Sequence, residues 1–228
     1  MVVMKDVYKK YPNGIVAVNG IDVEIQQGEF VYVVGPSGAG KSTFIKMMYR
    51  EERPTKGTIL VNDMDISKIK NRRVPIFRRS LGIVFQDFKL LEKRTVFENV
   101  AFALEVIEET PRTIKRKVLE VLDLVNLKHK AGMLPTELSG GEQQRVSIAR
   151  SIVNNPRIVI ADEPTGNLDP ETSKEIMNIF EEINSKGTTV IMATHNKDIV
   201  NSIRHRVIAI ESGMIVRDEQ RGDYGYEN

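Results

Sequence analysis

The chain has 228 residues, with 33 lysines and arginines against 31 aspartates and glutamates, a net charge of +2 and no cysteine. This balance lacks the basic excess of a nucleic-acid-binding protein, and the absence of cysteine excludes disulfides and thiolate metal sites. No apolar run approaches the roughly 18 residues that a membrane span requires, and the N-terminus lacks the apolar segment of a signal peptide. We therefore expect a cytoplasmic domain with a substantial core, for which another chain must supply any membrane span.

Residues 1–30 show the alternation typical of antiparallel strands. Ile21, Val23 and Ile25 alternate with polar residues, and the first turn follows Tyr11. From spacing alone Tyr11 is an ordinary aromatic residue at a strand end, although a ring at this place also suits stacking on a nucleotide base.

Residues 35–43 combine a glycine-rich turn with G-x-x-x-x-G-K-S spacing, between a predicted buried strand at 30–34 and a helix predicted to begin at Lys41. Glycines let backbone N–H groups converge on a phosphate, and a helix N-terminus adds free amides and its positive dipole end. Lys41 is expected to contact the β- and γ-phosphates, and Ser42 to offer its hydroxyl to Mg²⁺. The predicted nucleoside triphosphate site consists of Gly35, Pro36, Ser37, Gly38, Ala39, Gly40, Lys41, Ser42 and Thr43.

Two different stretches follow this glycine loop. The basic run at 67–80 is expected to form a solvated face rather than a binding patch.

A buried strand at 81–85 then ends at Gln86. Ligands of open α/β sheets lie at the carboxyl ends of strands, so Gln86 either contacts Mg²⁺ or a water, or caps a loop.

The pattern becomes helical at 87–155, which predicts a helical insertion in the α/β core. Phe88, Leu90 and Leu91 lie among charged residues of its first loop and are candidates to line a partner groove.

A helix start is predicted at Ser139, which forms a capping box with Glu142. Gly140 and Gly141 leave the amides of this helix N-terminus bare. The residues alone indicate either a plain cap or half of a composite anion site.

A buried strand at 157–161 ends in two acidic residues. Asp162 stands where a P-loop enzyme keeps a Mg²⁺ ligand, and Glu163 is placed to orient or deprotonate a water that attacks the γ-phosphate. A further strand at 188–193 leads to His195, which is expected to face the γ-phosphate rather than to be structural.

Together these motifs resemble the ATP-binding-cassette ATPases over nearly the whole chain. The matching motifs are the Walker A loop at 35–43, the Q-loop at Gln86, the LSGGQ-type signature at 138–144, Walker B at 158–163, the D-loop at 166–169 and the switch histidine at His195. In that family an aromatic residue near the N-terminus stacks on adenine, so the resemblance favours this role for Tyr11.

The resemblance implies an α/β fold, namely a RecA-like P-loop NTPase core with an N-terminal antiparallel β subdomain and a helical insertion. The implied parts are a β subdomain with the P-loop core at 1–86, a helical subdomain at 87–156, the rest of the core at 157–217 and a polar tail at 218–228, expected to be mobile from residue 222.

The resemblance also implies an ATPase with ATP and Mg²⁺ as cofactors. It assigns catalysis to Lys41, Gln86, Glu163 and His195, and Mg²⁺ to Ser42, Gln86 and Asp162. Cassettes of this family bind ATP head to tail as homodimers. ATP would therefore contact Tyr11 and the glycine loop of one copy, and Ser139, Gly140 and Gly141 of the other.

Within the family, residues 84–91 and 94–100 resemble the bacterial cell-division branch. That ATPase pairs with an integral membrane protein and is thought to activate peptidoglycan hydrolases at the septum. The resemblance implies a peripheral protein at the cytoplasmic face of the membrane, without a nucleic-acid partner. Lipoprotein-releasing and macrolide-exporting ATPases share residues 166–169 and are the alternative. A non-transport ATP switch, or a scaffold without turnover, is disfavoured by the single set of motifs and by the presence of Glu163 and His195.

Overall fold

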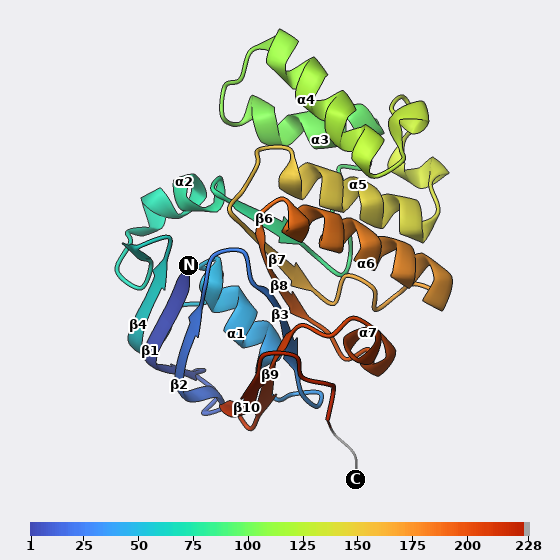
Figure 1. Ribbon diagram of the computed structural model, residues 1–228. Helices are drawn as coiled ribbons and strands as arrows, with labels where there is room; N and C mark the ends of the chain where they lie inside the picture. The colour runs from blue at the N-terminus through green and yellow to red at the C-terminus, as the bar shows by residue number, and fades with distance from the viewer. Residues whose placement is uncertain (226–228) are drawn as a thin grey trace. The chain divides into compact units, whose positions relative to one another are not determined.

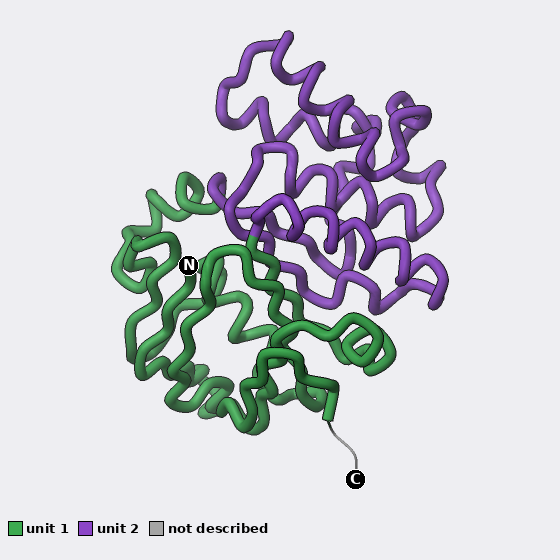
Figure 2. The backbone as a smooth tube through the Cα atoms, in the orientation of Figure 1, with its two compact units in different colours: residues 1–78, 189–228 green, residues 79–188 purple. Residues whose placement is uncertain are grey.

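The computed structural model describes residues 1–225, which form two compact units (Figure 2). The first unit contains Met1–Arg78 and the chain from Thr189 onward, and the second contains Arg79–Thr188. The limits of these two units differ from the boundaries of the predicted four-part division. That division stays a prediction. The end of the predicted polar tail, residues 226–228, lies outside the described residues.

An antiparallel sheet in the first unit has the strand order β2-β1-β4-β5. Its strands are β1 (Val2–Lys10), β2 (Val16–Ile25), β4 (Lys56–Val61) and β5 (Met64–Asp65). Ile21, Val23 and Ile25 of β2 are buried and the residues between them are exposed, because successive side chains of a strand point to opposite faces. The strands predicted for residues 1–30 are confirmed.

A second group of strands in the first unit has the order β10-β9-β3-β8. β3 (Phe30–Val34) runs parallel to β8 (Thr189–Ala193) and to β9 (Arg206–Glu211), and β10 (Met214–Glu219) pairs antiparallel with β9. All side chains of β3 and β8 are buried, as expected for strands covered on both faces. Helix α1 (Lys41–Met48) contacts both β2 and β8 (Figure 1).

Two short helices of the first unit were not predicted. A 3₁₀ turn at Asn71–Arg73 leads into α2 (Val74–Arg78), and α7 (Lys197–Ser202) begins after Asn196, whose side chain accepts from the Ile199 N–H. Helices of five and six residues are too short to show a helical period in the sequence.

The second unit is built around helix α5 (Gly140–Ile152). α5 contacts β6 (Leu81–Val84) and the helices α3 (Val96–Glu105), α4 (Pro111–Leu124) and α6 (Pro170–Ser185). β6 runs parallel to β7 (Ile158–Asp162), and 3₁₀ turns at Lys128–Lys130 and Pro135–Glu137 lie between α4 and α5. The predicted helical segment and both flanking strands are thereby confirmed.

Side chains cap the N-termini of these helices. Thr95, Thr110, Ser139 and Asp169 each accept a hydrogen bond from a backbone N–H of the first helical turn. Ser139 does so within a full capping box, so the predicted helix start is confirmed.

The end of the described chain is held against the first unit. Tyr224 is 6% exposed, its N–H donates to Asn201 Oδ1 at 2.8 Å, and its carbonyl accepts from the Arg217 guanidinium at 3.0 Å. The mobility predicted from residue 222 onward stays a prediction, and these contacts give the position of residues 222–225 in the structure. Tyr224 is a buried aromatic residue within this otherwise polar segment.

Membrane-spanning helices were not expected from the sequence. Within residues 1–225, no helix has both the length and the apolar character needed to cross a membrane.

Candidate functional site

The glycine loop connects β3 to α1 in the first unit. Gly35 has φ +148° and Gly40 has φ +107°. A Cβ on Gly35 would lie 2.1 Å from the Ile210 carbonyl oxygen, and one on Gly40 would lie 2.2 Å from that of Ala17. The loop is thus pressed against neighbouring backbone at two points where only glycine fits.

Lys41 folds back over the loop that precedes it. It is 9% exposed, and its Nζ donates to the carbonyl oxygens of Gly35 at 2.7 Å and Pro36 at 3.1 Å. The N-cap of α1 is Gly40, which has no side chain to accept from the first amides of the helix. An ammonium group above uncapped helical amides is the arrangement that binds a phosphate chain.

Tyr11 lies beside the start of α1. Its hydroxyl is 3.2 Å from Thr43 Oγ1, and Lys9 Nζ is 4.8 Å from the centre of its ring. Ser42, the predicted Mg²⁺ ligand, is exposed next to Thr43. The structure therefore holds the aromatic ring next to the glycine loop.

His195 leaves the parallel strands at the same edge as the glycine loop. The Thr194 N–H donates to the Val33 carbonyl at 3.2 Å, so the carboxyl ends of β8 and β3 are neighbours. Gly35 follows Val33 by two residues, and the exposed His195 follows Thr194 directly. The first unit thus brings together Tyr11, the glycine loop and His195.

Gln86, Asp162 and Glu163 lie together in the second unit. They follow β6 and β7, which are parallel neighbours. A Cβ built on Gly166 would lie 3.3 Å from Gln86 Nε2 and 3.6 Å from Glu163 Cβ, so these two side chains border the same glycine. Asp162 and Glu163 are half-buried and Gln86 is exposed.

Glu163 adopts a left-handed backbone conformation with φ +49°, which residues with a Cβ rarely do. Gln144, fully buried on α5, donates from Nε2 to the adjacent Pro164 carbonyl at 2.8 Å. Strained backbone is common at functional side chains and persists where surrounding contacts hold it. No sequence pattern indicated that Gln144 supports this turn, because Gln144 and Pro164 are 20 positions apart.

The signature residues lie at the start of α5. Ser139 and Gly140 are exposed, whereas Gly141 is buried against α6, where a Cβ would lie 2.4 Å from Thr172 Cγ2. Ser139 Oγ accepts from the Glu142 N–H at 3.3 Å, and Glu142 Oε2 accepts from the Ser139 N–H at 3.0 Å.

Glu142 is further fixed by an ion pair with Lys130. The hydrogen bond from Lys130, with that from the Ser139 backbone, lowers the pKa of Glu142 from 4.5 to about 2. The carboxylate therefore stays charged, which also suits its place at the N-terminus of a helix.

A cavity of about 320 Å³ in the second unit is lined by Asp87, Phe88, Lys89, Leu90, Glu92, Pro135, Thr136 and Gln143. Arg150 braces its rim by donating to the carbonyls of Phe88 at 2.9 Å and Lys89 at 2.7 Å, two successive residues with positive φ. Phe88 and Leu90 thus line a cavity, and its use as a partner groove stays a prediction. Leu91 does not line this cavity, and the buried Asn99 side chain binds the N–H and the carbonyl of Leu91.

The donor types present fit a nucleotide and Mg²⁺. In the first unit the glycine loop offers amides and an ammonium group to phosphate oxygens, and Ser42 carries an oxygen of the kind that Mg²⁺ prefers. In the second unit Gln86 and Asp162 carry such oxygens. In the described part of the chain, no three His, Cys, Asp or Glu side chains are grouped to hold a metal ion.

The match of residues 18–166 to the ABC transporter family, together with the Walker A and signature geometry above, decides the classification. The chain belongs to the ABC transporter family. It is an ATPase of the ABC type and has the α/β fold of that family's P-loop nucleotide-binding domain. The predicted resemblance, fold class and enzyme class are therefore confirmed.

Curated relatives of this ABC ATPase match it over its whole length. It is 72% identical over 225 residues to the cell division ATP-binding protein FtsE of Bacillus subtilis (strain 168), with 99% of each chain covered. It is 63% identical over 225 residues to the protein of that name from Streptococcus pneumoniae serotype 2, with 99% of this chain and 98% of the relative covered.

A solved relative supports the fold. The dimeric structure of a post-hydrolysis state of the ATP-binding cassette MJ0796, bound to ADP and Pi, has a TM-score of 0.88 and 34% identity, and covers 97% of this chain and 99% of that cassette.

Proposed function

We propose that this ABC ATPase drives a membrane complex of bacterial cell division, in which it pairs with an FtsX-like integral membrane protein. The observation that carries the proposal is 72% identity, over 99% of both chains, to a protein named as a cell division ATP-binding protein. The ATPase would act as a peripheral subunit at the cytoplasmic face of the membrane, at the septum. Its ATP-driven changes of conformation would reach peptidoglycan hydrolases through the membrane protein.

In this proposal the first unit binds ATP. Tyr11 stacks on adenine, and the loop of residues 35–43 surrounds the phosphates with amides and the Lys41 ammonium. His195 contacts the γ-phosphate. The support is that these three features converge within one compact unit.

The second unit supplies the acidic chemistry. Glu163 accepts a proton from the attacking water. Asp162 and Gln86, with Ser42 of the first unit, would hold Mg²⁺, which would supply charge neutralisation at the phosphates. Phosphoryl transfer needs positioning and charge stabilisation more than covalent catalysis, and the bracing of the Glu163 turn by Gln144 suits that demand.

Two copies would share each ATP. Ser139, Gly140 and Gly141 of one copy complete the phosphate site of the other, and ATP hydrolysis reopens the homodimer. Two features support this arrangement. One chain carries two glycine-containing helix N-termini, at α1 and at α5, and the solved cassette with ADP and Pi is dimeric. In this proposal the start of α5, which Ser139 caps, also binds the ATP of the partner copy.

The membrane protein would dock on the cavity that Phe88 and Leu90 line. This cavity directly follows Gln86, so a change at the nucleotide has a short covalent path to the docking surface. Arg150 and Asn99 hold the segment in one shape from opposite ends, which lets it transmit a displacement rather than absorb it.

The test is capture of the partner from detergent-solubilised membranes with the Glu163→Gln variant and ATP, followed by identification of the captured protein. We expect an FtsX-like membrane protein. Leu90→Asp should reduce capture while leaving ATP binding intact. Val106→Asp, which alters an exposed apolar residue elsewhere in the second unit, should not reduce capture.

Other captured partners would contradict the proposal in distinct ways. A permease for lipoproteins or macrolides would move the function to export and leave the ATPase roles standing. A ribosome or nucleic acid would overturn the membrane role altogether.

A further inference from the structure

The segment of residues 66–78 concentrates positive charge in the first unit. It contains Lys68, Lys70, Arg72, Arg73 and Arg78, and no acidic residue occurs between Asp65 and Asp87. The whole chain has a net charge of only +2, so this is a local accumulation rather than a share of a general excess.

Two of these cations are engaged in the fold. Lys68 forms an ion pair with Asp65 at 2.9 Å. Arg78 donates to the carbonyl oxygens of Tyr49 at 2.9 Å and Arg50 at 3.2 Å, and so attaches the segment to the end of α1. These two residues have structural roles.

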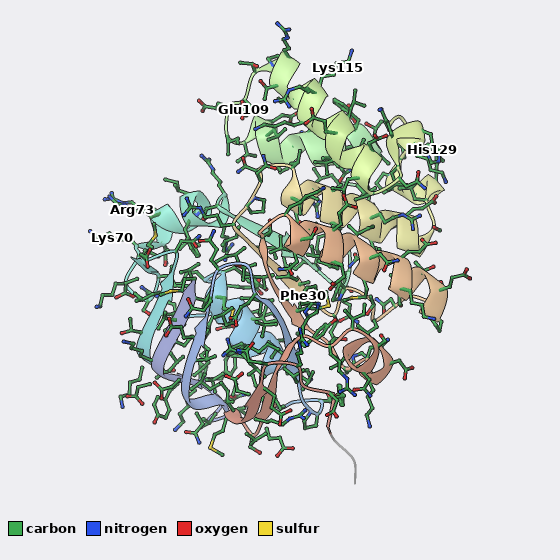
Figure 3. The ribbon with its side chains drawn as sticks, in the orientation of Figure 1. Phe30, Lys70, Arg73, Glu109, Lys115 and His129 are labelled. Carbon is green, nitrogen blue, oxygen red and sulfur yellow. The ribbon has the colours of Figure 1, made fainter. Side chains whose placement is uncertain are left out.

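The other three cations are directed to solvent. Lys70, Arg72 and Arg73 are exposed, and no hydrogen bond or ion pair engages their side chains within residues 1–225. Figure 3 shows Lys70 and Arg73 extending outward from the first unit. Three unpaired cations within four residues repel one another, and an external anion near them would offset this repulsion.

The segment is held firmly from its inner side. Arg50 is 5% exposed and donates to the carbonyls of Ile66 at 2.9 Å and Ile69 at 3.5 Å. Burial, with repulsion from Arg53 and Arg78, lowers the pKa of Arg50. The fold therefore keeps several cations close together here although they repel one another. The hydrogen bonds of Arg50 hold the backbone from which Lys70, Arg72 and Arg73 project.

An apolar residue lies among these charges. On α2, Val74 and Phe77 are buried and anchor the helix, whereas Ile76 is 62% exposed. A single exposed isoleucine is ordinary on its own. Beside three unpaired cations it gives the composition of segments that lie at a membrane surface, with charge for headgroups and an apolar group for the acyl boundary.

We propose that Lys70, Arg72, Arg73 and Ile76 form a lipid-contact patch that binds the anionic phospholipid surface of a membrane. The patch presents no aromatic side chain on which a nucleic-acid base would stack, which favours lipid over nucleic acid. The contact needs no partner protein, so it goes beyond the proposed pairing with an integral membrane protein and is independent of it.

The test is co-sedimentation of the purified full chain with vesicles of phosphatidylglycerol mixed with phosphatidylcholine, and with vesicles of phosphatidylcholine alone. We expect binding only to the anionic vesicles, weakened by salt and not by soluble glycerol phosphate. Each cation near an anionic surface contributes about fivefold, so the triple variant Lys70→Gln, Arg72→Gln, Arg73→Gln should bind about a hundredfold more weakly. Ile76→Ser should weaken binding by a few-fold without changing the salt dependence.

The matched control removes the same net charge elsewhere. Arg112→Gln, Lys115→Gln and Lys174→Gln alter three exposed cations of α4 and α6, and should leave vesicle binding within about twofold of the wild type. ATP turnover of both triple variants reports that they are folded. Equal binding by the two triple variants, no binding of the wild type to anionic vesicles, or complete displacement by a nucleic acid would each overturn the proposal.

Discussion

At the scale of single residues, Lys41 and Glu163 are both held in conformations that their neighbours enforce. Lys41 is turned over the loop by two carbonyl oxygens, and Glu163 occupies a left-handed turn that Gln144 supports. A phosphate chain would take over the hydrogen bonds that Lys41 now gives to its own loop. The two residues therefore make separable predictions for binding and for turnover.

Glu163→Gln should preserve ATP binding and abolish most turnover, because glutamine has nearly the same shape but accepts no proton. We expect phosphate release to fall by about 10²- to 10⁴-fold, the usual contribution of a general base. Equilibrium ATP binding, measured on the same preparation, should change little. Turnover at the wild-type rate would show that another group takes the proton.

Lys41→Ala should fail earlier, at binding. Hydrogen bonds from a charged donor contribute enough that ATP affinity should drop by about 10- to 100-fold. Lys46→Ala on the same helix is the control, since Lys46 is paired with Glu51 at 3.4 Å and has no predicted contact with ATP. Normal affinity in the Lys41 variant would count against the glycine loop as the phosphate site.

The ion pair of Glu142 with Lys130 predicts a pH dependence. A carboxyl whose pKa is lowered to about 2 stabilises the folded state above its ordinary pKa of 4.5, and this contribution is lost as the pH falls from 4.5 toward 2. Lys130→Met removes the largest cause of the shift and should lower the free energy of unfolding by about 1–2 kcal/mol at neutral pH.

Urea unfolding across a pH series measures this effect. The difference between wild type and Lys130→Met should be constant down to about pH 4.5 and shrink below it. A difference that is independent of pH would mean that Lys130 acts through packing.

Sequence patterns identified the residues of the candidate site but not the residues that support them. The chemistry of Lys41, Asp162 and Glu163 is visible because each follows a strand and stands in a recognisable spacing. Gln144 and Lys130 act on segments 20 and 12 positions away, and only the tertiary fold brings these pairs together.

At the scale of elements, the contact of α5 with α6 depends on the absence of a side chain. Gly141→Ala would place a Cβ 2.4 Å from Thr172 Cγ2 and force the two helices apart, whereas Gly140→Ala would meet no atom closer than 3.7 Å. We expect the first change to destabilise the chain by about 1–3 kcal/mol and the second to be nearly neutral.

Thermal unfolding of the two alanine variants measures the difference. Thr172→Ser removes the methyl group that clashes and should restore most of the stability of Gly141→Ala. Similar melting temperatures for the two alanine variants would show that α5 and α6 separate without cost.

Strands and helices with a clear pattern of apolar residues could be predicted from the sequence, and the short helices could not. β3 and β8 are continuous apolar runs because both of their faces are covered. α2 and α7 are only five and six residues long, and the burial of Tyr224 is that of a single residue in a polar context. The basic segment before β6 was expected to be only solvated. Within residues 1–225 its cations Lys70, Arg72 and Arg73 have no hydrogen-bond or ion-pair partner, which only the fold reveals.

At the scale of the whole molecule, the proposed ATP site requires two copies of the chain. Each chain has a glycine loop in one unit and a signature helix in the other, and the proposal assigns them to opposite sides of a shared ATP. The sequence suggested this division of roles only through its resemblance to a family, since no pattern within one chain reveals a partner copy.

The chain contains no cysteine, which permits a direct measurement of this arrangement. Ser37→Cys marks the glycine loop and Ser139→Cys marks the signature, and both positions are exposed. Each is made in the Glu163→Gln background, and the two variants are mixed and treated with a short bis-maleimide cross-linker. Ser185→Cys, on an exposed part of α6, replaces Ser139→Cys in the control mixture.

We predict that the mixture of Ser37→Cys and Ser139→Cys yields a covalent dimer with ATP and Mg²⁺, and much less without ATP, whereas the mixture with Ser185→Cys yields none under either condition. A dimer that forms equally without ATP, or no dimer with ATP, would contradict the composite site on which the proposed mechanism depends.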